Sequence, residues 1–176
     1  MPSGEVTFLK LHFKAVILPA YRKQYPATAN LPNELTIYDG DTSINGDGGV
    51  NYVAVTEGVA KEKSQAMRLF ALAHETGHSV TMDEFQSHGK TAYYPMGPDA
   101  KLWEYIADII GMRMLKAQLP GQAAAIMGEL GYLASWLGPG DPMHPDGTKR
   151  AELLEKCYRS DSFDTLFNAL ANKQIP

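Results

Sequence analysis

The sequence predicts an α+β fold in which helices predominate and the β-sheet is small. Segments with helical periodicity fill most of the chain after residue 64, whereas short β-favouring segments occur only at residues 34–38 and 50–56. Runs of helix that follow a few strands, without regular alternation of the two, are typical of α+β proteins. We therefore expect a mostly helical domain with a small antiparallel or mixed sheet in its N-terminal half.

Length and composition indicate one globular domain, residues 1–176. With 44% hydrophobic and 20% charged residues, a chain of 176 residues can bury a core of ordinary size. The net charge of −4 and the lack of a long basic run argue against nucleic acid as a partner. The longest apolar stretch, residues 123–137, contains Glu129 and is too short for a membrane span. It predicts a core helix instead.

The single cysteine, Cys157, excludes an internal disulfide framework. A reducing compartment fits this composition, and a cysteine-poor exported protein fits it nearly as well. Residues 1–13 contain no clean signal-peptide core. We therefore favour a cytoplasmic location, with a periplasmic or secreted one open if a signal peptide has been removed.

The N-terminal part predicts one helix and two strands. Residues 6–21 are amphipathic and fit a helix or an early strand, of which we favour the helix, and residues 26–32 favour a linker. The segments ELTIY at 34–38 and VNYVAVT at 50–56 are rich in strand-favouring residues. Between them, the glycine-rich segment at 45–49 predicts a turn, so we expect the two strands to pair antiparallel.

The remainder of the chain predicts helices joined by short loops. We expect helices over residues 64–82, 99–119, 122–137, 148–158 and 162–172. Ser64 and Asp99 are the expected N-caps of the first two, and Pro120-Gly121 ends the second. Residues 138–147 form a loop rich in proline and glycine.

An HExxH motif, His74-Glu75-Thr76-Gly77-His78, lies within the first of these helices. The surrounding segment is apolar nearly all round and should be buried, so a carboxylate there needs a partner. His74 and His78 lie one turn apart on the same face, so both can bind one Zn²⁺. Glu75 can then act as general base toward a metal-bound water. The alternative, a chance grouping of two histidines and a glutamate, fits the apolar context poorly.

A catalytic zinc site needs a third protein ligand and an open position for water. His88 lies in a polar segment, SHGK, and we expect it to be exposed to solvent. Glu104 is the better candidate, because it lies among apolar residues in WEYIAD with Asp108 one turn later. The alternative is an acidic pair that faces solvent. Like charges at that spacing repel, however, so the pair indicates a functional role for the two carboxylates. We expect Glu104 to bind zinc and Asp108 to accept the free N–H of a ligand histidine.

These motifs resemble the gluzincin metallopeptidases related to HtpX and the CAAX prenyl protease. The resemblance rests on RLFALAHETGH at 68–78, ExxADxxG at 104–111 and MHPDGTKRAEL at 143–153, and it spans residues 45–154. It implies a minimal zincin-like domain, a minigluzincin, with zinc as cofactor. The membrane-spanning helices, signal peptides and extra repeats of other members have no counterpart in this sequence, so their substrates and regulation do not carry over.

The same resemblance assigns roles to further residues. It implies that His74, His78 and Glu104 bind zinc and that Glu75 is the general base. It implies that His144 stabilises the oxyanion and that Arg150 holds the loop of His144 or the active-site carboxylates in place. It also implies that strand 50–56 is the edge strand that binds a peptide or protein substrate in extended form. The alternatives are an ordinary loop histidine and a solvated arginine at a helix start.

The segments at 68–75 and 104–108 are also similar to the ImmA/IrrE group, which cleaves repressors. Gly111 and the segment from His144 to Arg150 favour the first group. The expected function is therefore hydrolysis of peptide bonds by a zinc-dependent peptidase. A non-catalytic zinc-containing binding or immunity module, a repressor-cleaving protease, and hydrolysis of another amide or ester are the alternatives.

Overall fold

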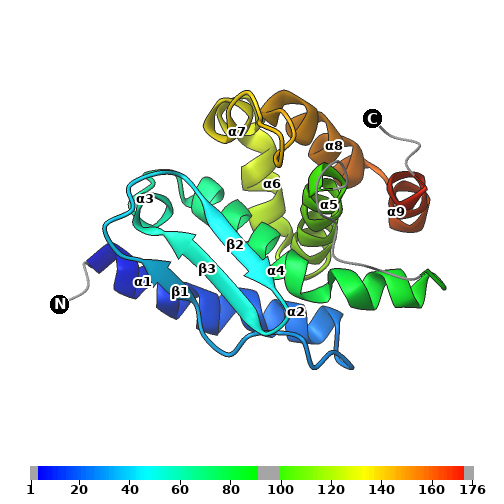
Figure 1. Ribbon diagram of the computed structural model, residues 1–176, viewed down its shortest axis with the longest axis horizontal. Coiled ribbons are helices and arrows are strands. Elements are labelled where there is room, and N and C mark those ends of the chain that lie inside the picture. The colour runs from blue at the N-terminus through cyan, green and yellow to red at the C-terminus, as the bar shows by residue number, and fades with distance from the viewer. Residues whose placement is uncertain (1–3, 91–99, 173–176) are drawn as a thin grey trace.

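A computed structural model describes residues 4–90 and 100–172 of the chain. It confirms the α+β class, because helices make up most of the structure and the strands form a single three-stranded mixed sheet. In Figure 1 the sheet lies toward one end of the molecule and α9 toward the other, with α4 and α5 between them. No helix in the described residues has the length and apolar character needed to cross a membrane.

The N-terminal segment is helical and extends beyond the expected residues 6–21. It consists of helix α1 (Gly4–His12), the π-helical turn η1 (Phe13–Ile17) and helix α2 (Leu18–Gln24). Leu9, Phe13, Ile17 and Tyr21 recur at intervals of four residues and are completely buried or nearly so. The hydroxyl of Tyr21 donates a hydrogen bond to the backbone carbonyl of Ala73. This bond joins the segment to the helix that carries the HExxH motif.

The sheet differs from the expected antiparallel pair. Its strands are β1 (Thr36–Tyr38), β2 (Gly46–Gly49) and β3 (Tyr52–Thr56), in the order β1-β3-β2. The two strands predicted from the sequence, β1 and β3, pair parallel, and β2 pairs antiparallel with β3. The glycine-rich segment expected as a turn is therefore mostly strand β2. The turn lies one step later, where Asn51 takes the left-handed conformation (φ 58°) that asparagine tolerates well.

Glycine forms a strand here because β2 lies directly on the motif helix. A Cβ atom on Gly46 would lie 2.4 Å from Oε1 of Glu75, and one on Gly48 would lie 2.1 Å from the carbonyl oxygen of Glu75. Only a strand without side chains on that face can approach so closely. Ser79 completes the contact, since its hydroxyl donates to the carbonyl of Gly49 at 2.7 Å. The close approach explains why strand propensity failed to identify β2.

Seven helices follow in the described residues. They are α3 (Glu57–Ala60), α4 (Gln65–Ser87), α5 (Ala100–Gln118), α6 (Pro120–Gly128), α7 (Leu130–Leu137), α8 (Gly147–Arg159) and α9 (Phe163–Ala171). Ser64 caps α4 as expected, because its hydroxyl accepts from the backbone N–H of Met67. The proposed N-cap of α5, Asp99, lies outside the described residues.

The predicted helix over 122–137 is two helices with a break at Glu129. Gly128 weakens the helix before the break. At the break, Glu129 leaves the helical conformation (φ −116°, ψ 20°), and its carboxylate accepts a hydrogen bond from Ser64 at 2.5 Å. The expectation of a core helix was also too broad, because Ala123, Ile126 and Leu133 are its buried residues and the others are partly or fully exposed.

Helices α4 and α5 cross at two glycines. A Cβ atom on Gly77 of α4 would lie 2.8 Å from the carbonyl oxygen of Ala107, and one on Gly111 of α5 would lie 3.1 Å from the carbonyl group of Ala73. The two backbones therefore nearly touch. This crossing brings residues 104–108 of α5 against the HExxH motif.

Gly77→Ala should destabilise the protein by about 1–3 kcal/mol, because the added methyl group forces the two backbones apart. The free energy of unfolding in urea, measured with a chelator present, tests this without any contribution from metal. Gly131→Ala in α7 is the matched control, because a Cβ atom there meets nothing within 4 Å. The control should be neutral or stabilising by up to about 1 kcal/mol. Equal stability of the two variants would contradict the close crossing.

Candidate metal centre

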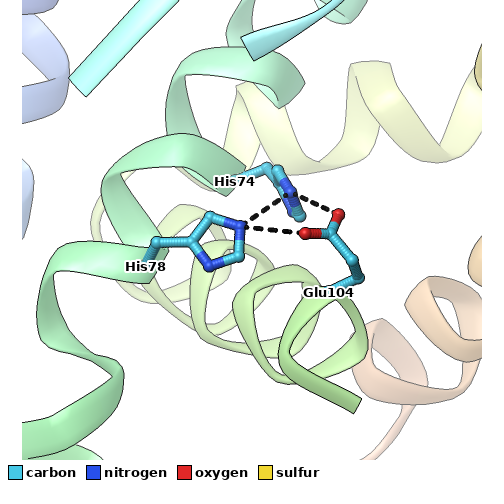
Figure 2. Close-up of side chains that lie close together, drawn as sticks. All are labelled: His74, His78 and Glu104. Carbon is cyan, nitrogen blue, oxygen red and sulfur yellow. Dashed lines mark hydrogen bonds and ion pairs between the residues drawn. The ribbon is translucent and has the colours of Figure 1, made fainter. Parts of the chain in front are cut away.

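Two histidines of α4 and one glutamate of α5 converge on a single point. Figure 2 shows the rings of His74 and His78, from successive turns of α4, facing the carboxylate of Glu104. The Nε2 atoms of His74 and His78 lie 3.2 and 3.3 Å from the two carboxylate oxygens, and 3.3 Å from each other. The two imidazole nitrogens and the carboxylate thus form a compact donor triangle, in which each nitrogen lies close to a different carboxylate oxygen.

The size of this triangle fits a zinc ion. Tetrahedral coordination with zinc–nitrogen and zinc–oxygen distances of about 2.0–2.1 Å places neighbouring donor atoms about 3.3–3.4 Å apart. The separation of the two nitrogens, 3.3 Å, lies within that range, and each nitrogen lies 3.2 or 3.3 Å from one oxygen of the carboxylate. Two imidazoles and one carboxylate are also a donor set that zinc accepts. His74, His78 and Glu104 can therefore hold one Zn²⁺ and leave one tetrahedral position open.

Asp108 orients the first histidine. Its Oδ1 atom lies 2.8 Å from Nδ1 of His74, and the carboxylate is buried at 1% exposure. A proton on Nδ1, donated to Asp108, leaves the lone pair of Nε2 free to face the centre of the triangle. This is the position that the sequence predicted for Asp108.

Arg150, near the start of α8, binds the two carboxylates of α5. Its Nε and Nη2 atoms each lie 2.8 Å from an oxygen of Asp108, and its Nη1 atom lies 3.6 Å from Oε2 of Glu104. The side chain is buried at 4% exposure, so this two-pronged ion pair is shielded from water. Of the two roles that the resemblance implied for Arg150, the contacts match the one that concerns the carboxylates.

The site carries an excess of negative charge. With neutral histidines, the carboxylates of Glu75, Glu104 and Asp108 and the guanidinium of Arg150 leave two negative charges uncompensated. Burial and Arg150 by themselves lower the pKa of His74, but the three carboxylates outweigh them and raise it to about 10. Burial by itself raises the pKa of Glu104, yet the two histidines hold it well below its usual range. A buried site of this charge favours a divalent cation.

Glu75 lies beside the donor triangle without being part of it. Its Oε1 atom is 4.0 Å from Nε2 of His74, and the residue is 9% exposed. Burial raises the pKa of Glu75, and the charges of His74 and His78 offset this only in part. Gly46 closes over the carboxylate from the sheet side. The carboxylate is thus held where it can exchange a proton with a water molecule at the centre.

His144 lies in the loop over residues 138–147, at the edge of the same pocket. The pocket has a volume of about 650 Å³ and is lined by the donor triangle, Glu75, Arg150 and His144. The side chain of His144 is 45% exposed, and its Nδ1 atom lies 2.8 Å from Oδ2 of Asp141. The structure thus brings His144 to the pocket, with its Nδ1 bound to Asp141.

Sequence reasoning missed Asp141, which organises this loop. Besides holding His144, the carboxylate accepts hydrogen bonds from the backbone N–H groups of Met143 and His144, each at 2.7 Å. The hydrogen bond from the His144 ring, with the two backbone bonds, lowers the pKa of Asp141 to about 2. Gly147 closes the base of the loop by donating to the carbonyl of Gly138 at 2.9 Å. An aspartate three residues before a histidine, in a segment of prolines and glycines, was the available signal.

Two other expectations need correction. Strand 50–56 was expected at the edge of the sheet, but β3 is the central strand and β2 is the edge strand beside the pocket. His88 was expected to face solvent, but its side chain is only 13% exposed because it stacks on Phe167 with ring centroids 4.3 Å apart. Its Nε2 atom lies 3.1 Å from Asp164 of α9, and its Nδ1 atom lies 2.8 Å from the carbonyl oxygen of Glu84 in the last turn of α4.

Comparison of the chain with protein-family models, with curated proteins and with solved structures finds no match. The resemblance to gluzincins therefore stays a prediction from the motifs at residues 68–78, 104–111 and 143–153.

The purified protein should bind one equivalent of Zn²⁺, which calorimetry and elemental analysis can measure. Glu104→Ala should remove most of this affinity, because it deletes one of three donors. Asp108→Asn should reduce the affinity about 10–100-fold, because the ring of His74 loses its anionic acceptor. His88→Ala is the control, since His88 contacts α9 and the last turn of α4 and does not line the pocket, and it should bind zinc as the wild type does. Unchanged zinc affinity in Glu104→Ala would exclude the assigned ligand set.

Proposed function

We propose that this protein is a zinc-dependent peptidase that hydrolyses peptide bonds. The observation that carries the proposal is the donor triangle of His74, His78 and Glu104, whose separations suit zinc, with the carboxylate of Glu75 beside it. The pocket of about 650 Å³ that adjoins the triangle supports a site that admits substrate. A purely structural zinc site has four protein ligands, whereas this cluster offers three within the described residues.

Different residues of the chain would carry out the separate steps of hydrolysis. Zinc, when bound, polarises the scissile carbonyl and lowers the pKa of a water molecule at the centre. Glu75 accepts a proton from the attacking water as its oxygen forms a bond to the carbonyl carbon. When the carbon–nitrogen bond breaks, Glu75 returns that proton to the leaving amine. Asp108 and Arg150 hold His74 and Glu104 in place throughout.

His144 can supply a hydrogen bond to the reacting carbonyl oxygen. When its ring is protonated on both nitrogens, Nδ1–H donates to Asp141 and Nε2–H is free to donate to an oxygen that gains negative charge. Such a donor strengthens its bond as the charge develops, so it lowers the barrier more than it strengthens substrate binding. The tight loop supports this role, because the bonds to Asp141 hold the ring at the edge of the pocket, and a donor held in one orientation needs less reorganisation during the reaction.

Substrate is expected to bind as an extended strand along β2. Within the described residues β2 pairs with β3 on one side only, so its other edge can accept a strand. The backbone N–H of Gly46 donates to the side chain of Asn45 at 2.9 Å, and a bound peptide would replace that bond. A peptide paired with that edge passes directly over Glu75, because Gly46 and Gly48 bring the strand onto α4. The hydrogen bonds come from the backbone, so they hold the peptide without regard to its sequence.

Glu75→Gln should keep zinc bound and lower the rate of peptide cleavage about 100- to 10,000-fold, because the amide cannot accept the water's proton. Cleavage of a quenched fluorescent peptide library by the zinc-loaded protein measures this. His88→Gln, a change of similar size at a residue in contact with α9, is the control and should cleave at the wild-type rate. Activity retained in Glu75→Gln would rule out the mechanism, and a zinc-loaded wild type that cleaves nothing would favour a non-catalytic module.

Asp141→Asn should lower kcat about 10-fold or more and leave KM nearly unchanged, because Asp141 acts on the reaction through the orientation of His144. Asp146→Asn is a control in the same loop. Asp146 caps α8 by accepting from Thr148 and Lys149, and asparagine caps a helix about as well as aspartate. Steady-state kinetics of the two variants should therefore differ. An equal loss in both would indicate a general disturbance of the loop and contradict the role of Asp141.

A further inference from the structure

The pocket extends from the donor triangle toward the N-terminal end of α4. Strand β2 runs alongside this helix, since Gly46 lies against Glu75 and Gly49 bonds to Ser79 one turn later. The residues just before β2 therefore lie toward the start of α4. Ile44 is among them, and it lines the pocket with 40% of its surface exposed.

The pocket residues in this direction are uncharged, and most of them are apolar. This part of the lining, called here the apolar end, comprises Ile44, Val59, Phe70, Ala71, Trp136 and Leu137. Val59, Phe70 and Ala71 are buried at 1%, 3% and 7% exposure and form its floor, while Ile44 stands at its rim. The floor is continuous with the metal centre, because the ring of Phe70 stacks on that of His74 with centroids 5.9 Å apart.

Arg150 is the one arginine or lysine among the described residues that lines the pocket, and it is already paired. The guanidinium of Arg150 lies 5.9 Å from the centre of the Phe70 ring, but its N–H groups bind Asp108. The wall opposite β2 comes from α7, which is held against α8 where Leu137 meets the backbone of Gly147. Apart from the N–H group of Trp136, which is buried without a hydrogen-bond partner, a side chain that enters here meets mainly carbon surface and no charged partner, so a charged group would bind poorly.

An extended peptide paired with β2 points every second side chain toward α4. When its scissile carbonyl lies beside Glu75, a neighbouring side chain on the Ile44 side of the cleaved bond faces the apolar end. We propose that this site selects peptides with a large apolar residue, such as Leu, Phe or Met, at that position. The inference rests on the proposed peptidase function. The expected preference for Leu over Ala at this position is about 10- to 100-fold in kcat/KM.

The test uses two readouts on the zinc-loaded protein. A peptide library locates the position, either from the cleaved bond identified by mass spectrometry or, if nothing is cleaved, from the peptides that bind Glu75→Gln. Two peptides are then made that differ only in Leu or Ala at that position. Cleavage of the pair is measured with the wild type. Binding of the same pair is measured with Glu75→Gln, whose contacts with substrate do not depend on turnover. Leu should exceed Ala in both measurements.

Ile44→Asp places a charge at the rim of the apolar end without disturbing the core, because Ile44 is 40% exposed. This change should weaken binding and cleavage of the Leu peptide about 10-fold and leave the Ala peptide within about 2-fold. Val50→Asp is the matched control, because Val50 is a β-branched residue of 41% exposure at the other end of β2 that does not line the pocket. It should change neither peptide.

Ala71→Leu fills the floor of the apolar end and should reverse the preference toward the smaller residue. Retained zinc binding and an unchanged circular dichroism spectrum show that this variant folds. Cleavage and binding without preference for Leu, or the same response in Ile44→Asp and Val50→Asp, would overturn the subsite while the peptidase function stands. A Leu preference in binding without cleavage would support the subsite and contradict the proposed function.

Discussion

The close crossing of α4 and α5 governs the chemistry of the candidate site. Gly77 and Gly111 let the two backbones nearly touch, so the side chains of residues one turn away lie close together in a small volume. In that volume lie two histidines and the carboxylates of Glu104 and Asp108. Burying an unpaired carboxylate costs free energy, so the carboxylates at the crossing need positively charged partners from other parts of the structure.

This need for positive charge brings distant parts of the chain into contact. Arg150 supplies one positive charge, and by binding Asp108 it fixes the start of α8 against α5. The loop over residues 138–147 leads directly into α8, so the same ion pair sets where Asp141 and His144 stand over the pocket. The remaining charge suits a divalent ion held by the donor triangle. Fold and chemistry are therefore coupled, since a weaker pairing of Asp108 would also loosen the loop that faces the proposed substrate.

The sequence predicted what depends on local spacing and missed what depends on tertiary contacts. The positions of His74, His78 and Asp108 follow from helical periodicity, and the structure brings all three together. Strand β2 escaped prediction because its glycines are favoured only by the contact with Glu75, which lies far away in the sequence. The break at Glu129 likewise depends on Ser64, 65 residues earlier in the chain. Asp141 was missed because its hydrogen bonds to Met143 and His144 exist only in the folded loop.

Strand β2 has a further consequence for how such a site could diversify. Gly46 and Gly48 leave no room for a side chain between the strand and α4, so any substitution there disturbs Glu75 itself. The face of β2 that packs on α4 therefore cannot accept a residue with a side chain. Variation has to act through Ile44 before the strand and through α7 opposite, where Trp136 and Leu137 line the pocket. If the proposed function holds, preference for substrate and capacity for catalysis reside in separate residues, and the first can be redesigned while the second is left intact.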